Sequence, residues 1–182
     1  MYKWKKREDK KFFGLILFVV IVVGFVILIK SGGLQQPVQV PFSEGSIPDL
    51  STTGFVKVDA SAAVFGDSGF VSLTGGCYQL TANTEASQAQ SISDGIDKKV
   101  GPRPGTHDLI KDIFDNLKIK VVMVKIVDLR NDTFYGRLIL SGEDKILNLD
   151  SRPSDGIAIA VRTGAPIYIK EGLLAQQGKN IC

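Results

Sequence analysis

Two short segments of this 182-residue chain place arginine, proline, a hydroxyl residue and aspartate in the same order. Residues 103–108 read Arg-Pro-Gly-Thr-His-Asp, and residues 152–155 read Arg-Pro-Ser-Asp. In each segment the proline favours an extended approach, the hydroxyl can cap a helix, and the aspartate complements the helix dipole. Arginine can also hold a phosphate, and carboxylates with histidine can activate water. The pattern therefore indicates two helix starts that carry arginine and aspartate side chains.

The candidate site residues could also bind an anionic substrate and activate water for its hydrolysis. As catalytic residues we expect His107 (the only histidine), Asp108, Asp150 and Asp155, with Glu85 as a further acid. As substrate-binding residues we expect Arg103, Arg152 and Arg162, because guanidinium groups bind phosphate in a bidentate manner. A divalent metal is the cofactor that a metal-assisted nuclease would use, but the aspartates have no spacing that specifies one.

The same residues also have simpler structural interpretations. Asp150, Arg152 and Asp155 can form a partly buried ion-pair network at a helix start. His107 can be a first-turn helix residue with one hydrogen-bond partner, and Arg162 can pack along its own helix and pair locally. Catalysis requires in addition that the two Arg-Pro segments meet in one polar site.

Hydrophobic periodicity predicts an α+β domain over residues 54–182, with helices packed on a mostly antiparallel sheet. Strands are expected at 55–60, 70–74, 78–82, 120–129, 134–140, 145–150 and 166–170. Helices are expected at 85–98, 106–118 and 155–163, with one or two helical turns at 171–177. We expect Thr84, Thr106 and Ser154 to cap the three helices. The continuously apolar segment 121–124 predicts a central strand covered on both faces.

Local patterns refine this layout. Gly75-Gly76 predicts a two-residue hairpin, and Asn131-Asp132 and Gly142-Glu143 predict turns. The helix at 106–118 has one broad apolar face, formed by Leu109, Ile110, Ile113, Phe114 and Leu117. Residues 73–92 and 140–159 share the order hairpin, strand, cap, helix at an offset of 67 (140 minus 73). The sequence thus predicts a duplicated β-β-β-α unit.

The order of these motifs resembles the bifunctional nuclease (BFN) domain family. The segments that carry the resemblance are 103–109, 133–138, 150–160 and 162–167. It is weaker over 55–102, where Glu85-Ala86 matches the family's Glu-Ala at a helix start. Residues 80–83 read Leu-Thr-Ala-Asn in place of the family's Leu-Pro-Ile-hydrophobic run, which leaves the edge strand of the first half open. The resemblance implies an α+β fold and nuclease activity on DNA and RNA.

The N-terminal segments predict an anchored protein, an addition to a family that is typically soluble. Residues 12–29 are 18 uncharged, proline-free residues, which as a helix would span about 27 Å, close to the hydrocarbon core of a bilayer. A secretory signal peptide would have a shorter apolar region and a cleavage site. Basic residues within 1–11 favour a cytoplasmic N-terminus. We expect a basic cytoplasmic tail (1–11), a transmembrane helix (12–29), a tether (30–53) and an extracytoplasmic BFN-like domain (54–182).

The charge distribution limits the partners of this domain. Residues 1–30 carry seven of the 22 basic residues and two of the 19 acids, so the remainder has 15 basic and 17 acidic residues. We therefore expect poor nonspecific affinity for nucleic acid. The sequence shows no interleaving of aromatic and basic residues, and Phe134 and Tyr135 suit a core or sheet-surface position better than base stacking.

Three functions remain open from the sequence. The first is a membrane-anchored nuclease, the second a non-catalytic module that binds an anion or a protein at the same helix ends, and the third a structural domain that forms homo-oligomers. Cys77 and Cys182 can pair outside the cytoplasm. Alternatively, they are a half-buried thiol and a frayed chain end.

Overall fold

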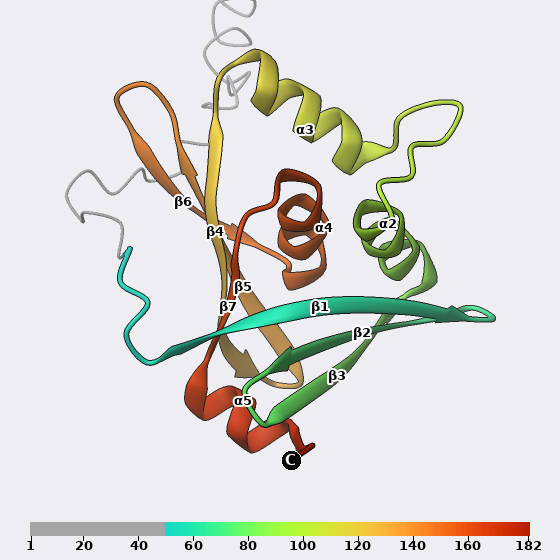
Figure 1. The fold of residues 1–182 in the computed structure, drawn as a ribbon, viewed down its shortest axis with the longest axis vertical. Coiled ribbons are helices and arrows are strands. Elements are labelled where there is room, and N and C mark those ends of the chain that lie inside the picture. The colour runs from blue at the N-terminus through green and yellow to red at the C-terminus, as the bar shows by residue number, and fades with distance from the viewer. Residues whose placement is uncertain (1–49) are drawn as a thin grey trace, which may run out of the picture. The chain divides into compact units, whose positions relative to one another are not determined.

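The computed structural model describes residues 50–182, which contain eight strands and four helices (Figure 1). The first half comprises β1 (Phe55–Phe65), β2 (Ser68–Gly75), β3 (Tyr78–Glu85), α2 (Ala86–Ile96) and α3 (Thr106–Asn116). The second half comprises β4 (Lys120–Arg130), β5 (Thr133–Ser141), β6 (Ile146–Ser151), α4 (Pro153–Thr163), β7 (Ile167–Lys170), α5 (Glu171–Gln177) and β8 (Lys179–Asn180).

All eight strands join one sheet in the order β6-β5-β4-β7-β1-β2-β3-β8. Every neighbouring pair is antiparallel except β4 and β7, which run parallel. The predicted α+β fold with a mostly antiparallel sheet is therefore confirmed. The predicted central strand is also confirmed, because β4 lies between β5 and β7 and its Val124 is fully buried.

The two halves of the domain have the same construction. Three-stranded meanders, β1-β2-β3 and β4-β5-β6, lie on either side of β7, and each continues directly into a helix. The bounds of α2 and α4 coincide at the offset of 67 residues (153 minus 86). Gly69 of β2 and Gly136 of β5 also correspond at this offset. The predicted β-β-β-α repeat is thus visible in the order of the elements.

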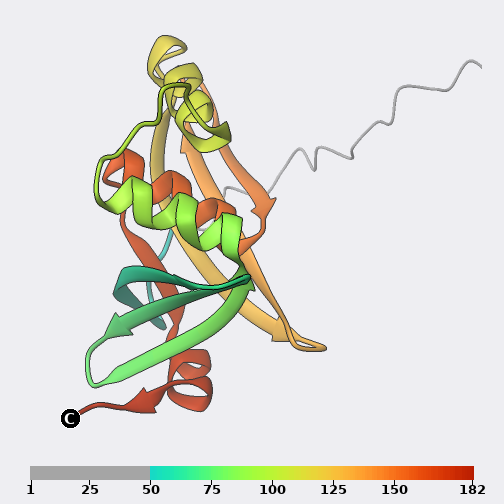
Figure 2. The same cartoon turned by 90° about the vertical axis from the view of Figure 1, so that its right-hand side faces the viewer.

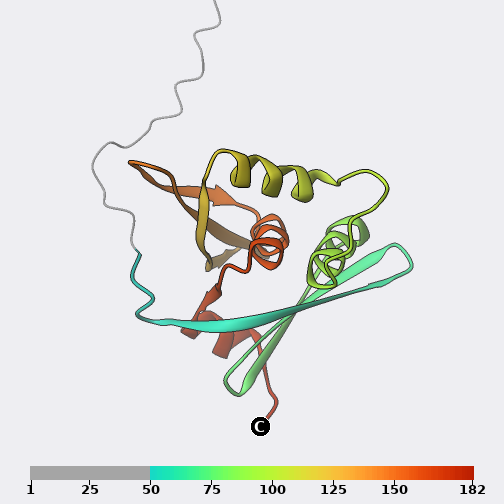
Figure 3. The ribbon, with the colours of Figure 1, turned by 45° about the horizontal axis from the view of Figure 1, so that its top comes forward.

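The helices α2 and α4 lie side by side on one face of the sheet (Figure 2). Their contact is close because Gly95 has no side chain; a Cβ there would lie 2.7 Å from Val161 Cγ2. On the sheet side, Gly156 lets α4 approach Val124. Beneath the two helices lies a single apolar core that includes Ile92, Ile157 and Ile169. The helix α3 crosses above α4 (Figure 3).

Several predicted boundaries are wrong, most of them by one or two residues, but β1 and β3 extend five and three residues beyond their predicted ends at 60 and 82. The predicted caps Thr84, Thr106 and Ser154 are displaced, since the residues that precede the helices are Glu85, Gly105 and Arg152. Pro153 starts α4 because its missing amide hydrogen and fixed φ suit the first helical position. The two-residue turn of the β2–β3 hairpin is Gly76-Cys77, because Gly75 pairs with Tyr78.

Two further expectations concern the edge strand of the first half and the N-terminal segments. The edge strand left open in the first half is formed, since β3 pairs with β2 along its whole length. The predicted transmembrane segment 12–29 and most of the tether lie outside the described residues. Within residues 50–182, no helix is both long and apolar enough to cross a bilayer.

The C-terminus is fixed to the turn of the β2–β3 hairpin by a disulfide between Cys77 and Cys182. The strand β8, which the sequence did not predict, adds to β3 through the pairs Tyr78–Asn180 and Gln79–Lys179. A backbone hydrogen bond of 2.9 Å from Ile181 to Cys77 continues this pairing. Of the two interpretations of the cysteines, pairing is the correct one.

Candidate functional site

The two Arg-Pro segments meet where α3 and α4 begin. His107 lies in the first turn of α3, and its Nε2 is 3.3 Å from Oδ1 of Asp155 in the first turn of α4. The histidine is 7% exposed, whereas the side chain of Asp155 is 30% exposed. The expected convergence of two helix starts is therefore present, with the imidazole inside and the carboxylate toward solvent.

A third helix contributes Ser91, which the sequence did not single out. Ser91 Oγ of α2 is 2.9 Å from His107 Nδ1. If the ring donates from Nε2 to Asp155, its Nδ1 accepts from the serine hydroxyl. Serine, histidine and aspartate thus form one hydrogen-bonded chain across three helices, and both ring nitrogens have partners.

Arg152 pairs with Asp155 at the solvent-exposed end of this series of hydrogen bonds. Its Nε and Nη2 donate to Oδ2 and Oδ1 of Asp155 at 2.8 and 3.1 Å. With its amide oriented to satisfy both neighbours, Gln88 of α2 donates to Asp155 Oδ1 at 3.1 Å and accepts from Arg152 Nη2 at 3.2 Å. The Arg152 side chain is nevertheless 65% exposed. It is consequently the cation of the site that a solute meets first.

A second ion pair lies deeper between the same helices. Arg162 Nε donates to Asp108 Oδ1 at 2.6 Å, and the two side chains are only 6% and 16% exposed. Arg162 Nη1 also donates to the carbonyls of Ser91 and Ala158 at 2.8 and 2.9 Å. Asp108 Oδ2 accepts from the backbone amide of Gly105. Local pairing of Arg162 is therefore only part of its role, because its main partner is 54 residues away.

Both aspartates are held in the ionised form. The hydrogen bond from Arg162 lowers the pKa of Asp108 against the opposing effect of burial. For Asp155 burial is the largest influence and opposes ionisation, but the hydrogen bonds and charges of Arg152 and His107 outweigh it and lower the pKa. Both carboxylates are therefore negatively charged at neutral pH.

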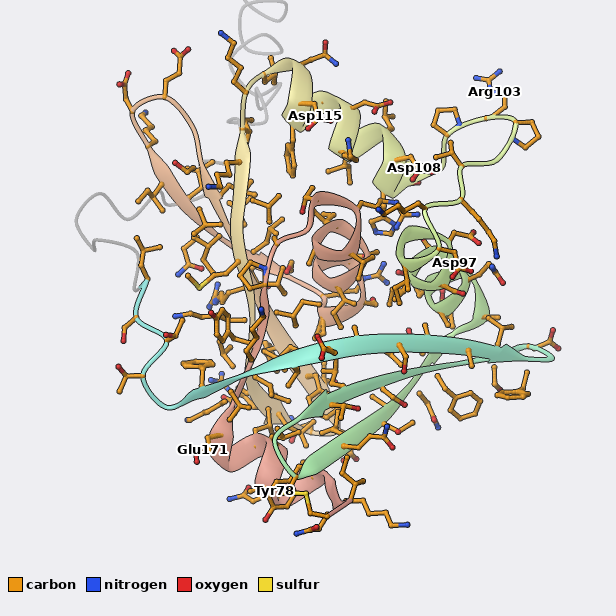
Figure 4. All side chains as sticks on the ribbon, in the orientation of Figure 1. Tyr78, Asp97, Arg103, Asp108, Asp115 and Glu171 are labelled. Carbon is orange, nitrogen blue, oxygen red and sulfur yellow. A yellow bond between two sulfur atoms is a disulfide. The ribbon has the colours of Figure 1, made fainter. Side chains whose placement is uncertain are left out.

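The structure does not bring every expected residue into this network. Asp150 lies on β6 with its side chain 71% exposed and faces Arg137 at 3.6 Å. Arg103 points outward from the loop between α2 and α3, away from Asp108 (Figure 4). Glu85 precedes α2 and adds, after Asp155, to the charges that raise the pKa of Arg152. The network defined by the contacts comprises Ser91, His107, Asp108, Arg152, Asp155 and Arg162.

The donor set of this network does not suit a divalent cation. Asp108 and Asp155 are the two carboxylates of this network, and each pairs with an arginine that neutralises its charge, so that the network offers a metal too few anionic oxygen ligands. Within residues 50–182 no group of three or more His, Cys, Asp or Glu side chains is arranged to hold a metal ion. We therefore derive no step of the chemistry through a metal.

Two hollows border the network but contain neither His107 nor Asp155. One, of about 130 Å³, lies beside Pro153 and Ser154 and is lined mostly by apolar side chains. The other, of about 670 Å³, is an open groove between α3 and the end of α4, lined in part by Lys111, Lys118 and Arg162. The exposed end of the network lies on an open surface, which suits a long, flexible substrate better than an enclosed small molecule.

Comparisons with known proteins place these residues inside a described family. The bifunctional nuclease domain family matches residues 78–181. An uncharacterized protein of Mycobacterium tuberculosis is 49% identical over 77 residues, which are 42% of this chain and 45% of that protein. Bifunctional nuclease 1 of Oryza sativa subsp. japonica is 30% identical over 83 residues, 44% of this chain and 25% of that protein. Bifunctional nuclease 2 of Arabidopsis thaliana is 29% identical over 82 residues, 43% and 25% of the two chains. The matched segments thus span less than half of these relatives.

Proposed function

The chain belongs to the bifunctional nuclease domain family, and on that premise we propose that it hydrolyses phosphodiester bonds of DNA or RNA where α2, α3 and α4 meet. The observation that supports this most is the hydrogen-bonded chain from Ser91 through His107 to Asp155. This chain joins the buried imidazole of His107 to the carboxylate of Asp155 at the surface, beside the exposed guanidinium of Arg152. General acid–base catalysis requires a positioned side chain within hydrogen-bond reach of the proton that it moves, and Asp155 is the member of this chain that solvent reaches.

In this proposal Asp155 accepts the proton of the attacking water. It is the member of the chain that water reaches, and its lowered pKa keeps it ionised at neutral pH. His107 is a positioning residue that holds Asp155 Oδ1 and stabilises its charge. Ser91 in turn orients the imidazole through Nδ1. The buried pair Asp108–Arg162 fixes the distance between α3 and α4.

Arg152 binds the scissile phosphate. Its guanidinium is 65% exposed and already lies beside Asp155, so that a phosphate on its free side is within reach of a water on the carboxylate. A planar guanidinium suits phosphate recognition and the stabilisation of charge that develops on its oxygens. This site needs a substrate strand that can lie on the surface.

Incubation of the full-length chain with 5′-labelled single-stranded DNA and RNA tests the proposal. We expect shortened products that disappear in Arg152→Gln and persist in Arg103→Gln, an equal loss of charge outside the network. Because the donor set does not suit a metal, cleavage should continue in EDTA. Intact substrate with the unmodified chain, with and without Mg²⁺ or Mn²⁺, would refute the nuclease proposal.

We further propose that residues 12–29 anchor the chain and that the domain is displayed outside the cytoplasm. The Cys77–Cys182 disulfide supports this placement, since disulfides persist in oxidising compartments. Protease added to intact cells that produce the chain should then digest residues 54–182. Digestion only after the cells are lysed would contradict the proposed orientation.

A further inference from the structure

A row of basic and aromatic side chains crosses the sheet on the face opposite α2 and α4, which we call the outer face. In the strand register, Arg137 of β5 is opposite Lys125 of β4, Lys125 is opposite Tyr168 of β7, and Tyr168 is opposite Lys57 of β1. Their sequence neighbours Leu138, Val124, Ile167 and Val58 point into the core, so alternation places the row on the outer face.

A second row runs beside the first. Tyr135 of β5 is opposite Asp128 of β4, and Phe55 of β1 is opposite Lys170 of β7. The two pairs are neighbours, because Lys170 contributes to the lowered pKa of Asp128, after the larger effects of Arg130 and of the Leu129 backbone amide. The Arg130 guanidinium lies over the Tyr135 ring, 5.1 Å from its centroid. Cations and aromatic rings are therefore interspersed over four adjacent strands, β5, β4, β7 and β1.

The charge of this face is positive even though the described domain as a whole is nearly balanced. Its cations are Lys57, Lys125, Arg130, Arg137 and Lys170, and its carboxylates are Asp59, Asp128 and Asp150. Two of these carboxylates are paired, Asp128 with Arg130 at 2.6 Å and Asp150 with Arg137 at 3.6 Å, which leaves more cations than carboxylates on the face. The unbalanced cations give a local positive field of the kind that attracts a polyanion.

Most of these side chains reach solvent. The side chains of Arg130 and Arg137 are 67% and 43% exposed, and Tyr135 is 37% exposed. Lys57 and Lys170 are also exposed. Lys125 is the exception, since it is buried, lies over the Phe55 ring and donates to the Ser51 carbonyl. We define the outer-face patch as Lys57, Arg130, Tyr135, Arg137, Tyr168 and Lys170.

We propose that the outer-face patch binds single-stranded nucleic acid, and this inference rests on the proposed nuclease function. Phosphates contact the lysines and arginines, while unpaired bases stack on Tyr135 and Tyr168. Such stacking tolerates any sequence, because every base has an aromatic face. A duplex buries its base faces and cannot use the tyrosines. The patch therefore favours single strands over duplexes.

The patch is continuous with the nuclease site around the edge of the sheet. The edge strand β6 pairs with β5 so that Arg137 is opposite Asp150 and Gly136 is opposite Ser151. The next residue is Arg152, whose guanidinium holds Asp155. A strand bound on the outer face needs only to turn around the end of β6 to bring a phosphate to Arg152.

Fluorescence anisotropy of a labelled 12-nucleotide oligo(dT) with the full-length chain tests the patch, with the length of the probe checked on a gel. We expect Arg137→Ala to weaken binding about fivefold. The slope of the logarithm of the binding constant against the logarithm of the salt concentration should become shallower by about 0.7, the value for one phosphate contact on a single strand. Tyr135→Leu should weaken binding about tenfold, whereas Tyr135→Phe keeps the ring and should bind within about twofold of the unmodified chain.

Lys179→Ala is the matched control, since it removes one exposed cation from β8 at the opposite edge of the sheet. Arg130→Ala removes a cation with an exposed side chain and tests the patch without touching the core.

Equal binding by Arg137→Ala, Tyr135→Leu and the unmodified chain would overturn the proposal, as would tighter binding of a 12-base-pair duplex. If these variants bind normally while Arg152→Gln abolishes cleavage, only the patch is refuted. If they lose binding and the unmodified chain cleaves nothing, the patch stands and the nuclease function is refuted.

Discussion

Arg162, at the end of α4, donates a 2.6 Å hydrogen bond to Asp108, in the first turn of α3, and both side chains are almost completely buried. The same guanidinium donates to the Ser91 carbonyl of α2. One arginine thus connects the three helices that carry the hydrogen-bonded chain of Ser91, His107 and Asp155. The positions of Ser91, His107 and Asp155 therefore depend on Arg162, although their side chains are not the groups to which it donates.

Removing Asp108 should strongly destabilise the domain. The variant Asp108→Ala leaves the Arg162 charge buried without its main partner, a defect that costs about 3–5 kcal/mol. The matched variant Asp115→Ala breaks the exposed pair with Lys111 on the same helix and should cost less than about 0.5 kcal/mol. Urea unfolding of both variants measures the difference. Equal midpoints would show that the buried pair contributes nothing specific.

The same pair predicts a loss of stability in acid. The pKa of Asp108 is lowered in the folded chain, so the unfolded chain takes up its proton first as the pH falls. The contribution of Asp108 is therefore complete above its ordinary pKa of 3.8 and declines as the pH falls through the lower, folded value. We expect the melting temperatures of the unmodified chain and Asp108→Asn to differ at about pH 6 and to converge below about pH 3. If the difference in melting temperature between the two proteins stays constant as the pH falls, the pKa of Asp108 is not lowered by folding.

Corresponding glycines in the two repeats should tolerate no side chain. A Cβ at Gly69 would lie 2.6 Å from both Ala89 Cβ and the Glu85 carbonyl oxygen, and one at Gly136 would lie 2.8 Å from the Ser151 carbonyl oxygen. Each alanine variant should lose about 1–3 kcal/mol of unfolding free energy. Gly172, in α5, is the control, because an added Cβ meets no atom within 4 Å and alanine favours the helix. If Gly69→Ala unfolds at the same denaturant concentration as Gly172→Ala, the close approach of α2 to β2 is wrong.

Reduction of the disulfide should lower stability without altering the sheet. The bond joins residues 105 positions apart and restricts the unfolded chain, an effect of about 2–5 kcal/mol. Thermal unfolding with and without reductant measures it, and the double variant Cys77→Ser/Cys182→Ser should match the reduced protein. Two titratable thiols in protein purified without reductant would contradict the bond.

The sequence was sufficient to predict the elements other than β8 because their signals are local. The apolar run of α4 and the glycine that ends it place this helix within two residues of its observed bounds. Asn131 and Asp132 form the predicted turn with positive φ angles of 47° and 57°, a conformation that these two residue types adopt readily. The repeat at an offset of 67 residues likewise required only comparison along the chain.

Contacts between distant segments could not be predicted in the same way. Ser91 has no motif around it, and its role follows only from the packing of α2 beside α3. Of the apolar face predicted for α3, only Ile110 and Phe114 pack against the core. Leu109, Ile113 and Leu117 remain 53%, 45% and 63% exposed, because periodicity does not say how much of a face is covered. The outer-face patch escaped notice because separate strands supply its cations and rings. They meet only through the register of the sheet.

The most direct test of the account compares the cleavage rates of Asp155→Asn and Asp150→Asn in the full-length chain, on saturating single-stranded substrate. Asparagine keeps the size of aspartate but cannot accept the proton of water. Asp155→Asn should therefore lose at least about a hundredfold in rate while the chain remains folded at the assay temperature. Asp150→Asn, five residues away and outside the network, should keep the rate of the unmodified chain. Undiminished cleavage by Asp155→Asn would contradict the central claim that the meeting of the two helix starts is the nuclease site.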